Sequence, residues 1–320
     1  MRLTVTGGCG FIGSHVVDQL VNAGHDVLVI DKHRLWANPA AEYLIGDVFD
    51  DRALETALDG RDAVFHLAGA ADVNEVAARP VDAVRLNIEG TGRVLDVARR
   101  RGCGRVVLAS TVWVYGATVG GRRAVAGQPH ELGPYLNGER TEDAPIDLTR
   151  SGHLYVATKL AAEMLMHSYL EMYGQEFTIL RYGIPYGPRM RDALVVARFV
   201  RAARSGEPIT ITGTGEQQRN FVYVEDLAEA HVLTLVEAAA NQTLALEGDT
   251  PLSVSEIAET VQHLVRQVPI RHVNGRLADY DGLSISNRLA KELLNWSPTT
   301  PLAEGIRRYL AWLDNEDGRA

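Results

Sequence analysis

Short continuous apolar runs alternate with longer amphipathic stretches through the first half of the chain. The apolar runs lie at 3–6, 27–30, 63–67, 106–109 and 177–180, and the amphipathic stretches lie at 11–23, 84–101 and 155–173. Apolar runs that do not alternate with polar residues are typical of strands covered on both faces. Strand–helix repetition predicts a doubly wound parallel sheet, an α/β fold with right-handed crossovers.

The second half of the chain has a less regular pattern. A helix is expected near 192–205, and two more are expected after Asn287 and Thr300. We predict a first domain over residues 1–180 and a smaller α+β lobe over 181–320, with 220–240 returning to the first domain. Residues 117–147 are rich in Gly, Pro and Arg, and a segment of that kind is usually a functional loop or a disordered one.

Charge argues against a nucleic-acid partner. The chain of 320 residues has a net charge of −9 and no long basic run, which is not the footprint of a nucleic-acid-binding protein. The basic cluster Arg99 to Arg101 comes just before Gly102. We expect it to end a helix, because cations suit the negative end of the helix dipole.

The cysteines and histidines narrow the class further. Cys9 and Cys103 are the only cysteines, which excludes a disulfide framework and favours a reducing compartment. The ten histidines show no metal-ligand spacing, so we predict no metal site. The first residues enter a strand rather than a leader peptide, and no apolar stretch is long enough to cross a bilayer. We therefore expect a cytoplasmic protein without a membrane partner.

A glycine-rich turn follows the first predicted strand. The segment TVTGGCGFIGSHVV places Gly7, Gly10 and Gly13 between a strand and a helix. The first glycine permits the tight turn, the second lets the backbone approach a pyrophosphate, and the third lets helix and strand pack closely. The helix N-terminus then offers N–H groups to a diphosphate. This pattern predicts a dinucleotide site.

Two carboxylates follow the next strands. Asp31 ends the second strand, where a carboxylate accepts hydrogen bonds from the adenosine ribose and repels a 2′-phosphate. It favours NAD over NADP, although Lys32 and Arg34 weaken that preference. Asp47 is placed to reach the adenine edge, and a helix N-cap is its alternative role.

The segment YVATK places Tyr155 and Lys159 on one face of a helix. A lysine ammonium favours the phenolate and lowers the pKa of a nearby tyrosine. The tyrosine can then remove an alcohol proton while hydride leaves the same carbon. In an arbitrary helix such a pair is usually a surface pair, but behind a dinucleotide loop it indicates dehydrogenase chemistry.

Together these motifs resemble the extended short-chain dehydrogenase/reductases, and among them the nucleotide-sugar epimerase/dehydratase family. The resemblance covers nearly the whole chain and rests on TGGCGFIG, DAVFHLAGAADV, NIEGT, STVWVYG, YVATK, RYGIPYGP, RNFVYVEDLAEA and LLNWSPTTPLAEGI. It implies a Rossmann fold, a tightly bound NAD, a nucleoside-diphosphate sugar with UDP as the expected nucleotide, and a homodimer formed through the helices near 84–101 and 155–173.

The resemblance also implies site residues. The catalytic residues that it implies are Thr111, Tyr155 and Lys159. The expected cofactor-binding positions, including those of the glycine turn, are Gly7, Gly10, Phe11, Ile12, Gly13, Asp31, Lys32, Asp47, Val48, Leu67, Ala68, Gly69, Asn87, Tyr155, Lys159 and Tyr182. The expected substrate-binding positions are Thr111, Val112, Trp113, Tyr155, Arg219 and Arg276.

The residues after Thr111 bear on the reaction. In the family that position bonds the reacting sugar hydroxyl, and the next two diversify the chemistry: 4,6-dehydratases carry an Asp-Glu pair, and decarboxylases usually carry a glutamate second. Here they are Val112 and Trp113, and neither can act as a general acid or base. We therefore expect C4 epimerisation through a 4-keto sugar and hydride return. Trp113 would offer an apolar face to the turning ring, or simply pack in the core.

Three alternatives stay open. One is a 4,6-dehydratase with relocated acid and base groups, another is a 4-ketoreductase, and the third is a non-catalytic NAD-binding protein. A net reductase would need free NADPH, against which Asp31 argues. Intact Thr111, Tyr155 and Lys159 argue against a non-catalytic role.

The chain departs from the family in two places. Ile184 replaces an asparagine that touches the substrate diphosphate in many relatives, while Arg219 and, less securely, Arg276 match arginines that bind it. A guanidinium suits bidentate phosphate binding, and a surface salt bridge is the alternative. The spacing from Thr111 to Tyr155 is also long, and the extra residues are expected to form either a lid over the sugar, a subunit contact or a disordered loop.

Overall fold

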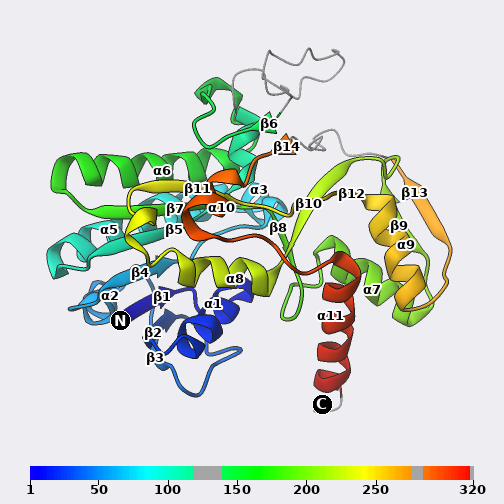
Figure 1. The fold of residues 1–320 in the computed structure, drawn as a ribbon, viewed down its shortest axis with the longest axis horizontal. Coiled ribbons are helices and arrows are strands. Elements are labelled where there is room, and N and C mark those ends of the chain that lie inside the picture. The colour runs from blue at the N-terminus through cyan, green and yellow to red at the C-terminus, as the bar shows by residue number, and fades with distance from the viewer. Residues whose placement is uncertain (118–138, 275–283, 318–320) are drawn as a thin grey trace.

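A seven-stranded, all-parallel sheet forms the centre of the computed structural model, which describes residues 1–117, 139–274 and 284–317 (Figure 1). Its strand order is β11-β7-β5-β4-β1-β2-β3. The strands are β1 (Arg2–Thr6), β2 (Asp26–Asp31), β3 (Glu42–Ile45), β4 (Ala63–His66), β5 (Arg105–Thr111), β7 (Glu176–Tyr182) and β11 (Gln242–Leu246). The predicted doubly wound α/β fold is thus confirmed. β3 is the strand expected before Asp47, and β11 is added at the other edge.

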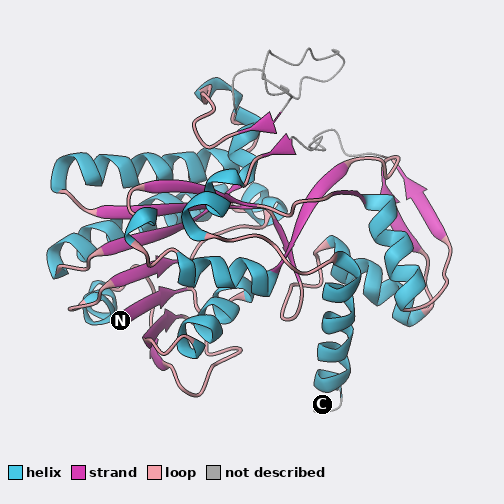
Figure 2. Ribbon diagram, viewed as in Figure 1, coloured by secondary structure: helices cyan, strands magenta, loops and turns pink. Residues whose placement is uncertain are grey.

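Helices cover both faces of this sheet (Figure 2). One face is covered by α1 (Phe11–Asn22), α8 (Val224–Leu233) and α10 (Arg288–Leu294), whose apolar side chains form one core with the sheet. The other is covered by α2 (Asp51–Leu58), α5 (Gly90–Arg101) and α6 (Leu154–Tyr173). The order runs outward from β1 in both directions, so the sheet has a switch point between β1 and β4, where a crevice opens at the carboxyl ends of the strands.

A smaller lobe with its own apolar core adjoins one end of this sheet (Figure 1). Its helices are α7 (Val195–Ser205), α9 (Val254–Leu264) and α11 (Leu302–Asp317). Its strands are β8 (Ile184–Tyr186), β9 (Ile209–Thr212), β10 (Gln218–Tyr223), β12 (Pro251–Ser253) and β13 (Ile270–Val273). A further short pair, β6 (Glu139–Arg140) and β14 (Ser284–Ile285), joins two distant segments. The exact division into domains stays a prediction.

The stretch expected as one helix over 84–101 is interrupted. After α3 (Val73–Ala78) and α4 (Pro80–Val84), a π-helical turn occupies Arg85–Glu89 before α5 begins. The extra residue of a π turn lets Asn87 face inward, and Asn87 is only 2% exposed. The periodicity could not reveal this, because the turn is held by contacts of Asn87 with residues far along the chain.

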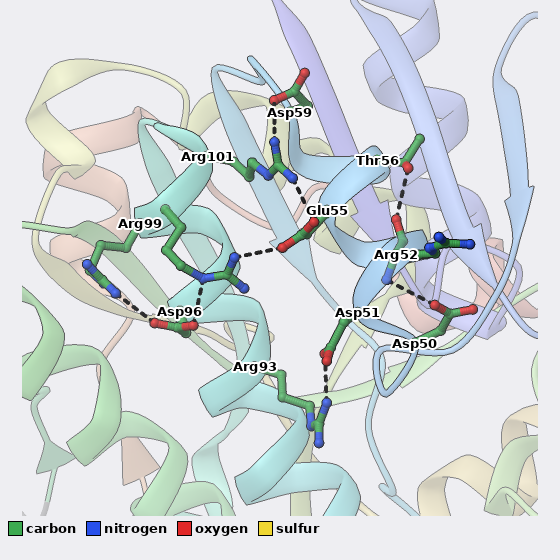
Figure 3. A network of polar contacts seen from close by, with 11 residues as sticks. Asp50, Asp51, Arg52, Glu55, Thr56, Asp59, Arg93, Asp96, Arg99 and Arg101 are labelled. Carbon is green, nitrogen blue, oxygen red and sulfur yellow. Dashed lines mark hydrogen bonds and ion pairs between the residues drawn. The ribbon is translucent and has the colours of Figure 1, made fainter.

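The basic cluster ends α5, as its sequence position predicts (Figure 3). Gly102 follows in the left-handed conformation, with a φ of +67°. Arg99 pairs with Asp96 at 2.9 Å, and Arg101 pairs with Glu55 of α2 at 2.6 Å. Both pairs are partly exposed, so the first stabilises α5 and the second fastens α5 to α2 only weakly. The two pairs account for the cluster without a polyanionic partner.

The segment between α10 and α11 is fastened to α8 by one buried carboxylate. Asp226 accepts hydrogen bonds from the backbone N–H groups of Thr299 at 3.0 Å and Thr300 at 2.8 Å, and from both hydroxyl groups. Its carbonyl oxygen accepts a hydrogen bond from the indole of Trp296 at 2.8 Å. This carboxylate therefore ties the end of the chain to the sheet.

We expect Asp226→Ala to lower the free energy of unfolding by about 3 kcal/mol, because it leaves buried N–H and hydroxyl groups without an acceptor. Urea unfolding followed by circular dichroism measures this loss. The matched control is Glu225→Ala, which removes a half-exposed carboxylate on the same helix turn and should cost less than about 1 kcal/mol. Equal losses in the two variants would contradict the assignment.

Candidate active site

The turn between β1 and α1 is built from glycines that leave no room for a Cβ atom. Gly7 has a φ of +72°, and a Cβ there would lie 2.7 Å from the backbone nitrogen of Ala68. A Cβ on Gly13 would collide with the carbonyl oxygen of Gly7. Gly10 is the N-cap of α1, and no side chain caps the first N–H groups of this helix. The turn therefore fits a diphosphate.

Asp31 is held at the end of β2, directly beside this turn. Its Oδ2 accepts a hydrogen bond from the backbone N–H of Cys9 at 2.9 Å, and its Oδ1 accepts one from the N–H of His33 at 3.1 Å. A carboxylate at this place can accept hydrogen bonds from a ribose. The turn and the carboxylate together suit the adenosine half of a dinucleotide.

A cavity of about 350 Å³ adjoins the ends of β2 and β4. Lys32 and Asp47 line it and form an ion pair at 2.7 Å. The alternative role for Asp47 is wrong, because the N-cap of α2 is Asp50. Val48, next to Asp47, is buried in the core between the sheet and α5. Ala70 and Leu86 also line the cavity.

The loop after β4 is locked to α6 through Asn87. The side-chain amide of Asn87 accepts a hydrogen bond from the N–H of Ala70 at 2.8 Å, and it donates to the Ala70 carbonyl at 3.0 Å and to the Thr158 hydroxyl at 2.9 Å. A Cβ on Gly69 would lie 3.1 Å from the Asn87 amide oxygen and 3.3 Å from Lys159 Nζ. Leu67 and Ala68 precede this glycine, and their N–H groups bond Thr6.

The three predicted catalytic residues lie together at the carboxyl end of β5. Tyr155 stands in the first turn of α6, which His153 caps by accepting the Tyr155 N–H at 3.0 Å. Lys159, one turn later, donates from Nζ to the Ala109 carbonyl at 2.9 Å. Thr111 ends β5, and its hydroxyl bonds the Tyr155 side chain. All three are less than a tenth exposed.

Burial dominates the electrostatics of this group. It raises the pKa of Tyr155 to about 12, while the Thr111 hydroxyl and the charge of Arg191 act in the opposite direction. Burial also lowers the pKa of Lys159 to about 8, and the charge of Glu163 opposes this shift. Burial therefore outweighs any effect of the Lys159 ammonium on the phenol, because the low-dielectric setting disfavours both charged forms.

Trp113 packs directly against the phenol. The two rings are 6.3 Å apart at their centroids and meet edge to face at 78°. The backbone N–H of Trp113 bonds the Thr111 hydroxyl at 3.2 Å. Val112, which lies between Thr111 and Trp113 in the sequence, is buried. No titratable side chain therefore follows Thr111 at these two positions.

Two residues near this group were missed by the sequence patterns. Arg191 pairs with Asp72 at 3.4 Å and acts on Tyr155 through its charge. His66, at the end of β4, is buried between the hydroxyls of Thr6 and Thr91, and burial lowers its pKa to about 3. His66 stands inside the quoted HLAG segment, but nothing in that segment marks it as a neutral hydrogen-bonding group.

The other predicted positions divide between the sheet and the smaller lobe. Tyr182 ends β7, and its hydroxyl bonds His231 at 2.6 Å. Phe11 packs against the core of the smaller lobe, whereas Ile12 packs against the core of the sheet. Arg219 lies on β10, where it interacts with the charge of Glu247. Arg276 falls outside the residues that the structure describes, and so do residues 118–138, which make up most of the segment expected to form a lid, a subunit contact or a disordered loop.

Comparison with known proteins places the chain. The model of the NAD-dependent epimerase/dehydratase family matches residues 3–245. The chain belongs to this family. Within it, UDP-glucuronic acid decarboxylase 6 of Arabidopsis thaliana is 33% identical over 96% of this chain and 87% of the relative. A UDP-glucuronate 4-epimerase of Thermodesulfobacterium geofontis is 30% identical over 96% of this chain and 94% of the relative.

A solved structure agrees with this epimerase/dehydratase assignment. The UDP-glucuronic acid 4-epimerase of Bacillus cereus, in complex with UDP-glucuronic acid and NAD, superimposes with a TM-score of 0.84. It is 25% identical over 99% of this chain and all of that one. The family is NAD-dependent, and the glycine turn and Asp31 fit that cofactor. In the described part of the chain, no helix has the length and apolarity to span a membrane, and no cluster of metal-binding side chains occurs.

We expect Gly13→Ala to weaken NAD binding more than about tenfold, roughly 1.4 kcal/mol, because the added methyl group displaces the turn. Nucleotide released from denatured protein and a fluorescence titration with NAD both measure this loss. Gly92→Ala is the matched control, since that helical glycine has open space around it and should keep the parent affinity. Equal NAD affinity in both variants would show that the turn between β1 and α1 does not bind the cofactor.

Proposed function

We propose that this protein is a 4-epimerase of a UDP sugar, with Tyr155 as the group that removes and returns the proton of the sugar O4 hydroxyl. The observation that carries this proposal is the combination of Thr111, Tyr155 and Lys159 with Val112 and Trp113. The first three suit oxidation of an alcohol. The last two supply no second acid or base at the positions where relatives with other reactions carry one.

Each residue has a defined task in this reaction. Thr111 orients the sugar hydroxyl through its own hydroxyl, which can donate and accept. Tyr155 takes the proton as the alcohol becomes a ketone, and gives it back when the opposite face of the ketone is reduced. Lys159 holds the active geometry through the Ala109 carbonyl and places an ammonium near the phenol. When bound, NAD supplies the hydride acceptor and a positive charge beside this phenol.

The surroundings of Tyr155 suit a ring that must turn over. Trp113 stands edge-on to the phenol, so the sugar would meet an apolar surface rather than a fixed set of hydrogen bonds. A 4-keto sugar held only by its diphosphate could then present either face to the same hydride. This would account for inversion at C4 with the cofactor regenerated.

UDP-glucuronate and UDP-glucose are the first substrates to test, because similar proteins are named for reactions of these sugars. Decarboxylation of UDP-glucuronate is the second candidate. Its support is the 33% identity to a decarboxylase. The apolar pair after Thr111 favours epimerisation over it.

We expect the purified protein, without added cofactor and in deuterated water, to convert one of these sugars to its C4 epimer. Proton NMR should show no deuterium at C4 or C5, because the hydride returns internally and C5 is never deprotonated. Carbon dioxide and a pentose product would show a decarboxylase instead, and loss of water would show a dehydratase. Either result would overturn the epimerase proposal.

Variants of Tyr155 separate chemistry from binding in the same assay. Tyr155→Phe should lose turnover by at least about a hundredfold while still binding the sugar nucleotide. Tyr173→Phe, at the exposed end of the same helix, is the matched control and should keep full turnover. Intact turnover in Tyr155→Phe would exclude the phenol as the base.

We also propose a homodimer formed through α5 and α6. The support, beyond the family resemblance, is that α6 exposes Met164 at 55% and Met172 at 68%, together with Tyr173 at 49%. Apolar side chains gathered on one helix are typical of a subunit contact.

Light scattering coupled to gel filtration should give a dimer for the parent and a monomer for Met164→Glu combined with Met172→Glu. Charges buried without a partner in an interface are strongly unfavourable. Val273→Glu changes a similarly exposed apolar residue of the smaller lobe and should leave the dimer intact. A monomeric parent protein would contradict this proposal directly.

A further inference from the structure

Glu247 is a buried carboxyl group that the proposed reaction does not use. It follows β11, is 5% exposed, and its Oε2 has no hydrogen-bond partner among the residues that the structure describes. Among the residues that the structure describes, no other carboxylate has a buried oxygen without a hydrogen-bond partner. A buried polar atom without a partner normally costs stability, so this one indicates a site that a ligand completes.

The position of Glu247 is at the junction of the sheet and the smaller lobe. A Cβ on Gly183 would lie 2.9 Å from Glu247 Cγ, and the Gly183 N–H bonds the Leu246 carbonyl at 2.8 Å. Gly183 joins Tyr182 to Ile184, the first residue of β8. The Glu247 side chain therefore packs beside the segment that leads from the catalytic side of the sheet into the lobe.

Among the described residues, one counter-charge acts on Glu247. Arg219 on β10 is the charged group that acts on it. Asp249 is engaged by Asn287 at 2.7 Å and Lys291 at 2.8 Å, and Glu142 accepts the N–H of Ala245 at 3.0 Å. Burial raises the pKa of Glu247 to about 8, although Arg219 acts to lower it. At neutral pH the group is therefore a carboxylic acid with one O–H donor.

A neutral acid beside an arginine has a specific use. A carboxylate would cancel the guanidinium charge and repel an anion, whereas a carboxylic acid leaves that charge in place and adds a donor. Ile184, which follows Gly183 and begins β8, offers no side-chain hydrogen-bond donor. The diphosphate is the anionic group that every nucleotide sugar carries, and it is suited to a cation together with a hydrogen-bond donor.

We propose that Glu247 binds the substrate as a carboxylic acid, donating a hydrogen bond to a diphosphate oxygen beside Arg219. This inference rests on the proposed function, because it takes a nucleotide sugar as the ligand. The bound anion disfavours the carboxylate, so binding must take up a proton at pH values above the pKa of the free group. Below that pH the acid is already protonated and binding takes up none.

Isothermal titration calorimetry with UDP-glucose tests this on NAD-loaded protein in the Tyr155→Phe background, which removes both turnover and the titration of the phenol. Titrations at pH 7 and pH 9, each in two buffers with different protonation enthalpies, measure proton uptake. Lys159, whose pKa is about 8, titrates in the same range, so the contribution of Glu247 is read as the difference in uptake between the parent and Glu247→Gln, which keeps a donor but cannot titrate. We expect this difference to approach one proton at pH 9 and to be close to zero at pH 7.

Two further variants separate ligand binding from structure. Glu247→Leu should bind UDP-glucose about tenfold more weakly at pH 7, while Glu247→Gln should stay within about threefold of the parent. Asp249→Asn, an exposed carboxylate two residues away, is the matched control and should keep the proton uptake of the parent. A purely structural role would change thermal stability in the Glu247 variants without changing affinity or proton uptake.

The outcomes distinguish the two proposals. If the parent binds UDP-glucose while Glu247→Leu binds it equally well and Glu247→Gln takes up as many protons as the parent, Glu247 has no part in binding and the proposed epimerase stands. If the parent binds neither UDP-glucose nor UDP-glucuronate, the proposed substrate class is wrong, and the proposed role of Glu247 is wrong with it.

Discussion

Burial of the Lys159 ammonium is the constraint on which the rest of the site depends. Its Nζ reaches the Ala109 carbonyl of β5 at 2.9 Å, and the glycine at residue 69 leaves room for it, since a Cβ there would lie 3.3 Å from that nitrogen. Asn87 then fastens the loop after β4 to α6. A strand, a loop and a helix that are far apart in the sequence are thereby fixed around one charge. The same packing excludes water from Tyr155, which makes both charged forms unfavourable and leaves a bound cation to restore the phenolate.

The parts of this molecule that sequence predicts are those whose physical cause is local. Buried strands such as β1 and β5 are continuous apolar runs, and the glycine turn needs its glycines wherever it occurs, so both could be read directly. The inward turn of Asn87 could not, because its cause is the Thr158 hydroxyl 71 residues later in the chain. The effect of burial on the pKa of Tyr155 could not be predicted either, since burial is decided by tertiary packing. Arg191 and His66 carry no motif that names their role, and only their positions beside Tyr155 and Thr6 identify them.

Two glutamate–arginine pairs at this end of the sheet behave in opposite ways. Glu163 is bound by Arg181 through both of its oxygens, at 3.1 and 2.8 Å, and also accepts the Ser110 hydroxyl. Its carboxylate is satisfied, so this pair serves as a buried support behind the strand that carries Thr111. Glu247 has the same burial but leaves Oε2 unsatisfied, and burial therefore raises its pKa. The difference lies in the number of donors around each carboxyl group, and it separates a structural pair from one that a ligand can complete.

Under the proposed reaction, these features divide the cleft into two chemically different ends. At the reacting end the sugar meets Tyr155, Thr111 and the apolar face of Trp113, so few directional contacts resist rotation of a keto sugar. At the other end Arg219 and a neutral Glu247 would hold the diphosphate, whose charge is far from the carbon that reacts. A ring that is tethered firmly at one end and loosely at the other can turn without leaving the protein. Inversion would then follow from how weakly the sugar itself is held, and an added acid or base beside Thr111 would serve a different reaction.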